Sequence, residues 1–215
     1  MNTEELISKL SQDESRKASL NSPLYYGLWL ISILLLYATI SLLLLEIRPD
    51  IGIQLGRFPF ILEIVLLLFL TFAGSMAAIF SMYPDCYQKP FFLKVPCIIF
   101  VALISFIAFQ IITMPFDPRM VVIPSHGHGM ECALCIAALA CLPSALIFGL
   151  VRKGATVTSV SAGSLSVLAA SGLGSLILRL TETDDSLLHI ALWHYVPTLL
   201  FAAIGAVLGR FLLKW

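Results

Sequence analysis

Six uncharged or nearly uncharged stretches dominate this chain, and each is long enough to cross a lipid bilayer. A helix needs about 20 apolar residues to span a hydrocarbon core of about 30 Å. Because backbone polar groups inside lipid must be satisfied within the segment, we interpret the stretches as helices rather than strands. The predicted fold is an all-α, polytopic membrane helix bundle with six spans, Tyr25–Leu45, Phe58–Met82, Val95–Phe116, Cys132–Val151, Gly154–Leu178 and Leu187–Gly209.

The composition supports a membrane protein. Hydrophobic residues make up 59% of the 215 residues and charged residues only 12%, with a mean hydropathy of +0.96. Soluble domains carry about 25% charged residues. The net charge of zero gives no indication of direct nucleic-acid binding. We predict two parts, a tail over residues 1–23 and a six-helix transmembrane domain over residues 24–215, in contact with the lipid bilayer.

The distribution of basic residues predicts the orientation of the chain. With six spans, both termini lie on the same side of the membrane as the even-numbered loops. That side holds nine of the thirteen Lys and Arg residues, and the other side holds Arg48, Arg57, Arg119 and Arg179. Basic residues concentrate on the cytoplasmic side of membrane proteins, so we predict that both termini are cytoplasmic.

The tail before the first span is the only sizeable segment on the predicted cytoplasmic side. It begins MNTEELISKL, in which Asn2 or Thr3 can cap a short helix. Leu6, Ile7 and Leu10 then form one small apolar face. Such a short helix is marginal alone in water. Two interpretations stay open, a solvated leader or a peptide that folds onto a partner with these three residues as anchors.

Small residues and prolines mark the last spans. Gly163 in the fifth span, and Gly205 and Gly209 in the sixth, belong to stripes of small residues that let membrane helices approach closely. We favour packing within one bundle, with a homo-oligomer as the alternative. Pro143 and Pro197 lie within the fourth and sixth spans and are expected to kink them.

Glu63 is the one acidic residue within a predicted span. An ionisable group inside a membrane is a functional hypothesis by default. Here it lies close enough to the predicted outer surface to reach the interface or to pair with Arg57. We favour this structural role.

A run of histidine and cysteine residues lies at the start of the fourth span. The sequence PSHGHGMECALC places His126, His128, Cys132 and Cys135 in an H-x-H-x3-C-x2-C pattern on the predicted outer side. Imidazole and thiolate are ligands of Zn²⁺, copper and similar metals. The four residues are therefore candidate signal-sensing residues, with a metal ion as the candidate signal and no other cofactor expected. The alternative is that the cysteines are ordinary residues of an apolar helix.

The motifs of common soluble enzymes are missing from the sequence. It contains no Gly-rich phosphate loop, no nucleophile elbow, no H-E-x-x-H and no pair of carboxylates within one span, so we expect no enzyme. A transporter typically shows internal repeats and broken helices, and no clear repeat is visible here. A small multipass transporter or channel stays the main alternative function, with a structural membrane protein as a third.

Several short motifs follow one another in an informative order. The first span ends in EIRPDI, the fourth opens with a cysteine and runs to a proline, and the last loop reads TETDDSLLHIALWHY. The chain ends in GAVLGRFLLKW. Together these motifs resemble the NrsF family, the negative regulators of sigma F, and the resemblance covers nearly the whole chain. The residues that carry it are Arg48, Pro49, Asp50, Cys132, Pro143, Asp184, Asp185, Ser186, Trp193 and Tyr195.

This resemblance implies a function. Members are six-span anti-sigma factors of the bacterial inner membrane that hold an extracytoplasmic-function sigma factor until an envelope, redox or metal signal arrives. The resemblance also implies that the cytoplasmic tail contacts the sigma factor. Many members carry a second outer cysteine before Asp-Asp-Ser, where this chain has Glu182. Cys132 must therefore work with Cys135 or with the histidines, or it has no sensing role.

Overall fold

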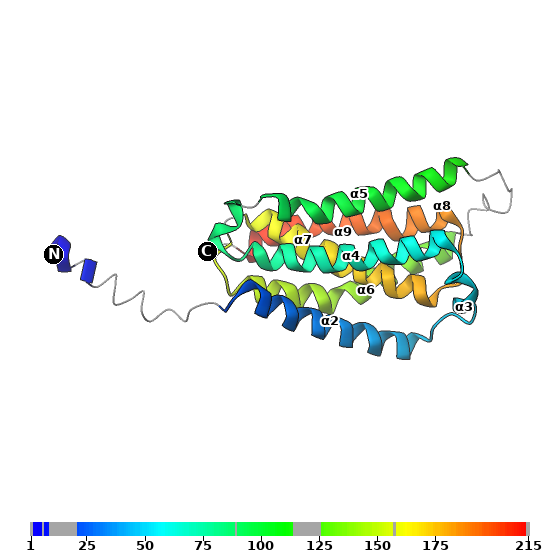
Figure 1. Ribbon diagram of the computed structural model, residues 1–215, viewed down its shortest axis with the longest axis horizontal. Coiled ribbons are helices and arrows are strands. Elements are labelled where there is room, and N and C mark those ends of the chain that lie inside the picture. Colours follow the sequence, from blue (N-terminus) through cyan, green and yellow to red (C-terminus); the bar gives the residue numbers. More distant parts are fainter. Residues whose placement is uncertain are drawn as a thin grey trace.

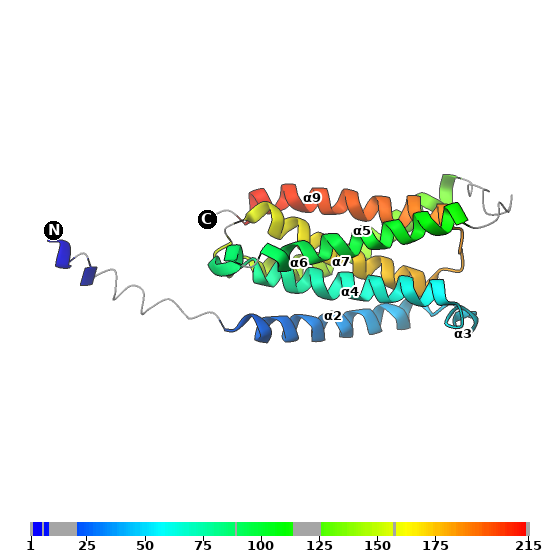
Figure 2. The same cartoon turned by 45° about the horizontal axis from the view of Figure 1, so that its top comes forward.

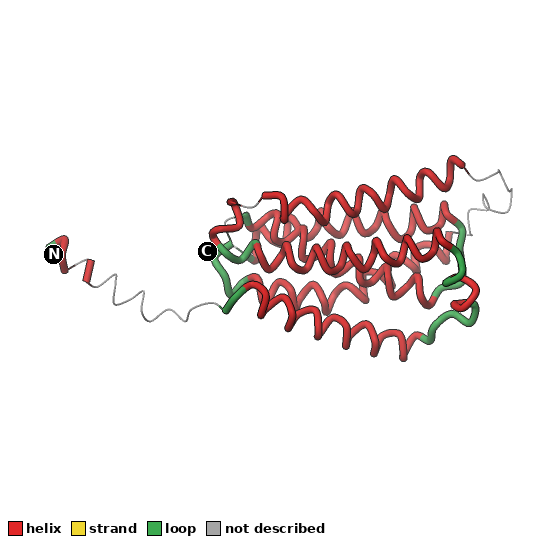
Figure 3. The backbone as a smooth tube through the Cα atoms, in the orientation of Figure 1, coloured by secondary structure: helices red, strands yellow, loops and turns green. Residues whose placement is uncertain are grey.

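The computed structural model describes residues 2–5, 7–8, 21–88, 90–113, 126–156 and 158–213. Within these ranges the chain forms helices and connecting loops and contains no strand (Figure 3). Six helices are long and apolar enough to cross a membrane, which confirms the predicted fold class. They are α2 (Pro23–Leu45), α4 (Phe58–Phe80), α5 (Pro90–Thr113), α6 (His126–Val151), α7 (Ser159–Thr181) and a last span made of α8 (Leu187–Ile190), the π-helical turn η3 (Ala191–Tyr195) and α9 (Val196–Leu212).

The outside of the bundle is apolar. Large hydrophobic side chains on the peripheral helices are more than two-thirds exposed, among them Leu43, Leu44, Phe58 and Ile112. Soluble monomers rarely expose large contiguous apolar patches. This surface is the one that a lipid-facing helix bundle requires.

Helix α7 lies at the centre, with α4, α6 and α9 packed around it (Figures 1 and 2). It has the lowest hydropathy of the six spans, yet 83% of its membrane-spanning window is buried, against 17–44% for the others. The reason is side-chain size, because its Gly, Ala and Ser residues let neighbouring helices approach closely. Hydroxyls such as those of Ser166 and Ser171 donate to carbonyls one turn earlier in the same helix, so they are not left unsatisfied.

The closest approach of α7 and α9 runs through glycines. A Cβ atom on Gly163 would lie 2.2 Å from the carbonyl oxygen of Gly205 and 2.6 Å from Cα of Gly209. Neither helix could carry a larger residue here without moving away. The small-residue stripes are therefore used for packing within the chain, as favoured from the sequence. A homo-oligomer stays a prediction that this packing does not require.

The last span changes its helical geometry just before Pro197. Proline has no backbone N–H to donate to the preceding turn. The π-helical turn η3 lies just before this proline, and Thr198 Oγ1 donates to the carbonyl oxygen of His194 at 2.7 Å. A kink was predicted at Pro197, and the structure shows a widened, π-helical turn just before it, a feature that is common at functional sites. Pro143, in contrast, lies inside a helix that runs without a break through α6.

The loops divide between two ends of the bundle. At one end, the Tyr83 hydroxyl donates to the carbonyl oxygen of Asn21, and Thr156 Oγ1 donates to that of Leu213 at 3.3 Å. This end gathers the start of α2, the even-numbered loops and the end of α9, as six spans require (Figure 1). The opposite end carries the charged loops that form the site described next.

We predict that Gly163→Ala destabilises the protein, because the added methyl group forces α7 and α9 apart. Overpacking of this kind costs about 1–3 kcal/mol. Gly149→Ala in α6 is the matched control, since a Cβ atom there meets nothing within 4 Å. Thermal unfolding in detergent should show a lower midpoint for Gly163→Ala only. Equal midpoints for the two variants would contradict the close glycine contact.

Candidate functional site

The chain turns sharply after α2 and crosses the end of α7. Glu46 ends α2 with a φ of 61°, a conformation that costs about 1–3 kcal/mol in residues other than glycine. The backbone N–H of Arg48 then donates to the carbonyl oxygen of Leu180 at 3.0 Å. Asp50 precedes the short helix α3 (Ile51–Gln54). The Arg-Pro-Asp segment is therefore held directly over the C-terminal end of α7.

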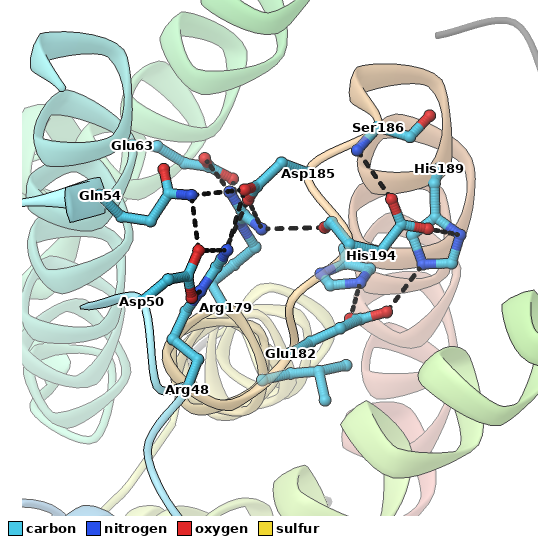
Figure 4. A network of polar contacts seen from close by, with 12 residues as sticks. Arg48, Asp50, Gln54, Glu63, Arg179, Glu182, Asp185, Ser186, His189 and His194 are labelled. Carbon is cyan, nitrogen blue, oxygen red and sulfur yellow. Dashed lines mark hydrogen bonds and ion pairs between the residues drawn. The ribbon is translucent and has the colours of Figure 1, made fainter. Parts of the chain in front are cut away.

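Arg48 lies at the centre of a salt-bridge network at this end (Figure 4). Its side chain is fully buried. Its guanidinium donates to both oxygens of Asp50, at 2.7 and 2.8 Å, and to both oxygens of Asp185, at 2.9 and 2.8 Å. The Gln54 amide donates to the same two carboxylates, at 3.0 and 2.7 Å. Because bidentate pairs fix the orientation of both partners, Arg48 joins the loop before α3 to the loop before α8.

A second arginine extends this network into the bundle. Arg179 on α7 makes a bidentate ion pair with Glu63 on α4, at 3.0 and 3.1 Å, and both side chains are almost completely buried. The hydroxyl of Tyr195 donates to the same carboxylate. Arg179 also reaches Asp185 at 3.3 Å, which connects the two parts. We call this set the arginine network: Arg48, Asp50, Gln54, Glu63, Arg179, Asp185 and Tyr195.

The partner of Glu63 corrects a prediction from the sequence. Contact with the membrane surface or with Arg57 was expected, but Glu63 is 3% exposed and pairs with Arg179, 116 residues away in the chain. Arg57 is exposed at the N-terminal end of α4. Glu63 lies on the face of α4 that packs against α7. Spacing along the sequence shows only neighbours within the same segment, so it could not reveal a partner on another helix.

The arginine network shifts the pKa values of its loop residues. Hydrogen bonds from Arg48 and Gln54 hold the pKa of the Asp50 carboxyl far below its usual range. Burial raises the pKa of Asp185, but the hydrogen bond and charge of Arg48 and the charge of Arg179 outweigh burial and leave it lowered. Hydrogen bonds to Asp50 and Asp185 raise the pKa of Arg48. These groups are therefore charged at neutral pH, and their stabilising contribution is lost only as the pH falls through the lowered carboxyl pKa values.

A second group of side chains lies beside the network, and we call it the His–Cys cluster: Cys132, Glu182, His189 and His194. Their potential ligand atoms all lie within 4.8 Å of one another. The Cys132 thiol donates to Glu182 Oε1 at 3.2 Å. Nε2 of His189 lies 3.2 Å from Oε1, and Nε2 of His194 lies 3.0 Å from Oε2 (Figure 4). Glu182 thus contacts every other member of the cluster.

Three of the six spans bring the cluster together. Glu182 directly follows α7, and the last span contributes His189 from α8 and His194 from η3. Helix α6 contributes Cys132, and its first turn packs tightly against the last span at Gly129. A Cβ atom on Gly129 would lie 2.2 Å from the ring of Trp193. This close contact places the start of α6, and with it Cys132, beside the histidines.

The two imidazoles are buried without a hydrogen bond among the described residues. His189 is 2% exposed and His194 is 0% exposed. Their nitrogens lie 3.0–3.6 Å from carboxylate oxygens, but none of these contacts has hydrogen-bond geometry, and Glu182 Oε2 is also unsatisfied. Buried polar groups nearly always have a partner, so this cluster calls for an explanation. A thiolate, two imidazoles and a carboxylate are together a donor set that suits a metal ion.

The structure gathers a different set of residues from the predicted metal site. Cys132 belongs to the His–Cys cluster, whereas Cys135, three residues further along α6, is exposed. His126 and His128 are helical positions of α6, but their side chains lie outside the described part of the structure. The four-residue set H-x-H-x3-C-x2-C therefore stays a prediction.

The predicted partner-binding residues lie in the N-terminal tail. Residues 3–5 and 7–8 are helical, as the sequence predicted, and Ile7 is 60% exposed. Leu6 and Leu10 lie outside the described residues. Their role as anchors is not tested by the structure.

Sequence reasoning missed Glu182, His189 and His194 as members of the cluster. Two signals were present, because both histidines lie on the same predicted side as Cys132 and Glu182 stands where the resemblance implies a cysteine. The missing information was tertiary. The π-helical turn before Pro197 buries histidines five residues apart, which an α-helical pattern does not indicate.

The fold and the site together define a six-span helical membrane protein with a polar, partly buried site at one end of its bundle. The chain belongs to the NrsF family, since the family model described as negative regulator of sigma F matches residues 10–215. The match covers all six spans and the whole polar site, and it begins after Leu6 and Ile7. No match was found among curated proteins or among solved structures. The family description is that of a regulator and not of an enzyme.

We predict that Arg179→Gln strongly destabilises the bundle, because it leaves Glu63 buried without its cation. Breaking a buried ion pair costs about 3–5 kcal/mol. The double variant Arg179→Gln/Glu63→Gln should recover part of this loss, since the unpaired charge is gone. Denaturant unfolding of the detergent-solubilised protein measures both effects.

The matched control for this prediction is Arg57→Gln, which removes an exposed arginine at the start of the same helix as Glu63. It should leave the unfolding midpoint unchanged. Two results would argue against the Arg179–Glu63 pair. One is a loss of stability in the double variant that equals the sum of the losses in the two single variants, and the other is a large loss of stability in Arg57→Gln.

Proposed function

We propose that this protein is an anti-sigma factor of the bacterial inner membrane, which sequesters an extracytoplasmic-function sigma factor and releases it when a signal reaches the outer face. The observation that carries the proposal is the family match, which covers residues 10–215 and thus every span. The helix bundle supports it, because most of the described chain spans the membrane and only short segments are left to contact a soluble partner.

The N-terminal tail is the proposed contact with the sigma factor. Its described residues 3–5 and 7–8 are helical, and the side chain of Ile7 is exposed. A short amphipathic helix that lays its apolar face into a groove of a partner presents anchors of this kind. Leu6, Ile7 and Leu10 are the proposed anchors. A solvated leader is the alternative that the test below can support.

The proposed orientation places this tail in the cytoplasm, where a sigma factor acts. Support comes from the position of the start of α2, the even-numbered loops and the end of α9 at one end of the bundle (Figure 1). Nine of the thirteen Lys and Arg residues belong to that side in the sequence. The arginine network and the His–Cys cluster then face the periplasm.

A small transporter or channel is the other function considered from the sequence. Such a protein needs polar groups that are free to bind a solute near the middle of the membrane. Here Arg179 and Glu63 are paired with each other near one end. A cavity of about 630 Å³ between α2, α4 and α7 is lined almost entirely by apolar side chains. Neither feature favours solute transport.

We predict that Leu6→Asp, Ile7→Asp and Leu10→Asp together release the sigma factor, because a helix with these charges cannot bury its face against a partner without a large desolvation cost. The measurement is transcription from a sigma-dependent reporter, with an immunoblot of the membrane fraction. We expect transcription at the level of a strain that lacks this protein, with a normal amount of the variant in the membrane.

The matched control adds the same charge to the polar part of the same tail, as Ser11→Asp, Ser15→Asp and Ser19→Asp. It should leave repression intact. Unchanged transcription in the variant with altered anchors, at normal membrane levels, would show that the tail is a solvated leader. The sigma factor would then have to bind the short cytoplasmic loops.

Reporter fusions test the orientation. Fusions after Lys153 and at Trp215 should report a cytoplasmic location, and a fusion after Arg119 should report a periplasmic one. The reason is the excess of basic residues on the side of the termini. Opposite signals at all three positions would reverse the orientation and remove the tail from the cytoplasm.

A further inference from the structure

We propose that the His–Cys cluster is a binding site for a divalent transition-metal ion of the Zn²⁺ type. Cys132, Glu182, His189 and His194 would supply one sulfur, one oxygen and two nitrogen ligands. The site itself rests on the geometry of the described side chains. Its role as the signal that releases the sigma factor rests, in addition, on the proposed function.

The first support is the spacing of the ligand atoms. In a tetrahedral zinc site with metal–ligand distances of about 2.0–2.3 Å, neighbouring ligand atoms lie about 3.3–3.8 Å apart. The four potential ligand atoms of the cluster lie within 4.8 Å of one another. Three contacts made by the Glu182 carboxylate are already 3.0–3.2 Å long. Small side-chain movements are therefore enough to close the four ligands around one ion.

The second support is independent of spacing and comes from unsatisfied nitrogens. His189 and His194 are almost completely buried, and none of their ring nitrogens makes a hydrogen bond within the described residues. A buried imidazole is normally hydrogen-bonded or bound to a metal. Each ring has a nitrogen close to the Glu182 carboxylate, at the centre of the cluster. A bound ion would satisfy one nitrogen of each ring.

The surroundings of His189 resemble those of a metal-binding histidine. Its Nδ1, the nitrogen that does not face Glu182, lies 3.6 Å from Asp184 Oδ2, which is close but longer than a hydrogen bond. Asp184 is itself held by the backbone N–H of Ser186, which donates to Oδ1 at 2.8 Å. A carboxylate next to the second nitrogen of a ligand histidine recurs in metal sites, where it orients the ring.

The local charge also favours a cation. The arginine network contains two arginines and three carboxylates that pair with one another, so it has no spare positive charge for the cluster. Glu182 belongs to the cluster and Asp184 lies beside it, and among the described ion pairs neither has an arginine or lysine partner. A divalent ion would offset these charges in a site with little access to water.

The donor set selects the class of ion. Mg²⁺ and Ca²⁺ prefer all-oxygen sites, whereas a thiolate with two imidazoles suits Zn²⁺ and chemically similar ions. Four protein ligands also resemble a structural site more than a catalytic one, which usually keeps an open position for water or substrate. The expected outcome of binding is therefore a change in the arrangement of helices rather than a reaction.

Binding at this position would act on the loop between α7 and α8. Glu182 belongs to the cluster, and Asp185, three residues later, is held by both arginines of the network. Cys132 comes from α6, so the affinity of the site depends on where α6 lies relative to the last span. This dependence meets the requirement that a ligand can shift a conformational equilibrium only if it binds the two states differently.

The direct test measures metal binding by the full-length protein in detergent after treatment with a chelator. Co²⁺ is the probe, because its charge-transfer and visible bands report thiolate ligation and tetrahedral geometry, and Zn²⁺ is the competitor. We expect a single Co²⁺ per chain with a thiolate band that Zn²⁺ abolishes. A protein that shows no such band, or only bands of hydrated Co²⁺, would overturn the site.

Variants assign the ligands. Cys132→Ser should abolish the thiolate band, and His194→Gln should weaken binding and alter the visible bands. Asp184→Asn should lower the affinity by about 10- to 100-fold, as is typical for loss of a carboxylate that orients a ligand. Cys135→Ser is the matched control, since this exposed cysteine lies on the same helix and should not contribute. A thiolate band that survives Cys132→Ser, or one that Cys135→Ser removes, would overturn the assignment.

The regulatory role has a separate readout in cells. Added Zn²⁺ should raise sigma-dependent transcription in cells with the wild-type protein or Cys135→Ser, and should have no effect with Cys132→Ser. Metal binding in detergent without induction in cells would keep the site and overturn its role as the signal. Failure of the proposed function would look different, because the tail variant would then leave transcription unchanged while metal binding persisted.

Discussion

The buried ion pair between Arg179 and Glu63 determines how the bundle is assembled. An unpaired charge inside a membrane bundle is costly, so the two side chains must face each other. Tyr195 donates to the same carboxylate, and α4, α7 and η3 therefore meet at one point. This contact also fixes the rotation of α7 about its axis. The small residues of α7 allow close packing, but their side chains are too small to determine that rotation by themselves.

The loop between α7 and α8 belongs to both polar sites. Asp185 holds the arginine network together, and Glu182 is the residue that every other member of the His–Cys cluster contacts. A movement of the Glu182 side chain at the cluster therefore also displaces the loop, which is anchored to α2, α3 and α7. Helix α6 begins beside this loop and ends at Val151, next to the loop at the opposite end of the bundle. A single element thus connects the proposed signal site with the side that carries the tail.

The sequence predicted the fold class and the six spans, because apolar runs of this length have few other solutions in a lipid environment. It also identified the Arg-Pro-Asp and Asp-Asp-Ser motifs, but not that Arg48 and Asp185 pair across 137 residues. The expected contact of Glu63 with the membrane interface or with Arg57 was wrong, because the sequence shows only neighbours that are close along the chain and Arg179 lies 116 residues away. Cys132 was found by its spacing, whereas His194 joins it through a π-helical turn that no α-helical pattern reveals.

The proposed function depends on binding of a sigma factor by the tail at one end of the bundle. Photo-crosslinking in intact cells tests it most directly, with a photoreactive amino acid in place of Ile7, and in place of Ile53 at the opposite end as the control. Both positions are at least 60% exposed, so both can reach a partner. We expect a covalent adduct with a sigma factor from position 7 and none from position 53. An adduct from position 53, or none from position 7 while repression is intact, would contradict it.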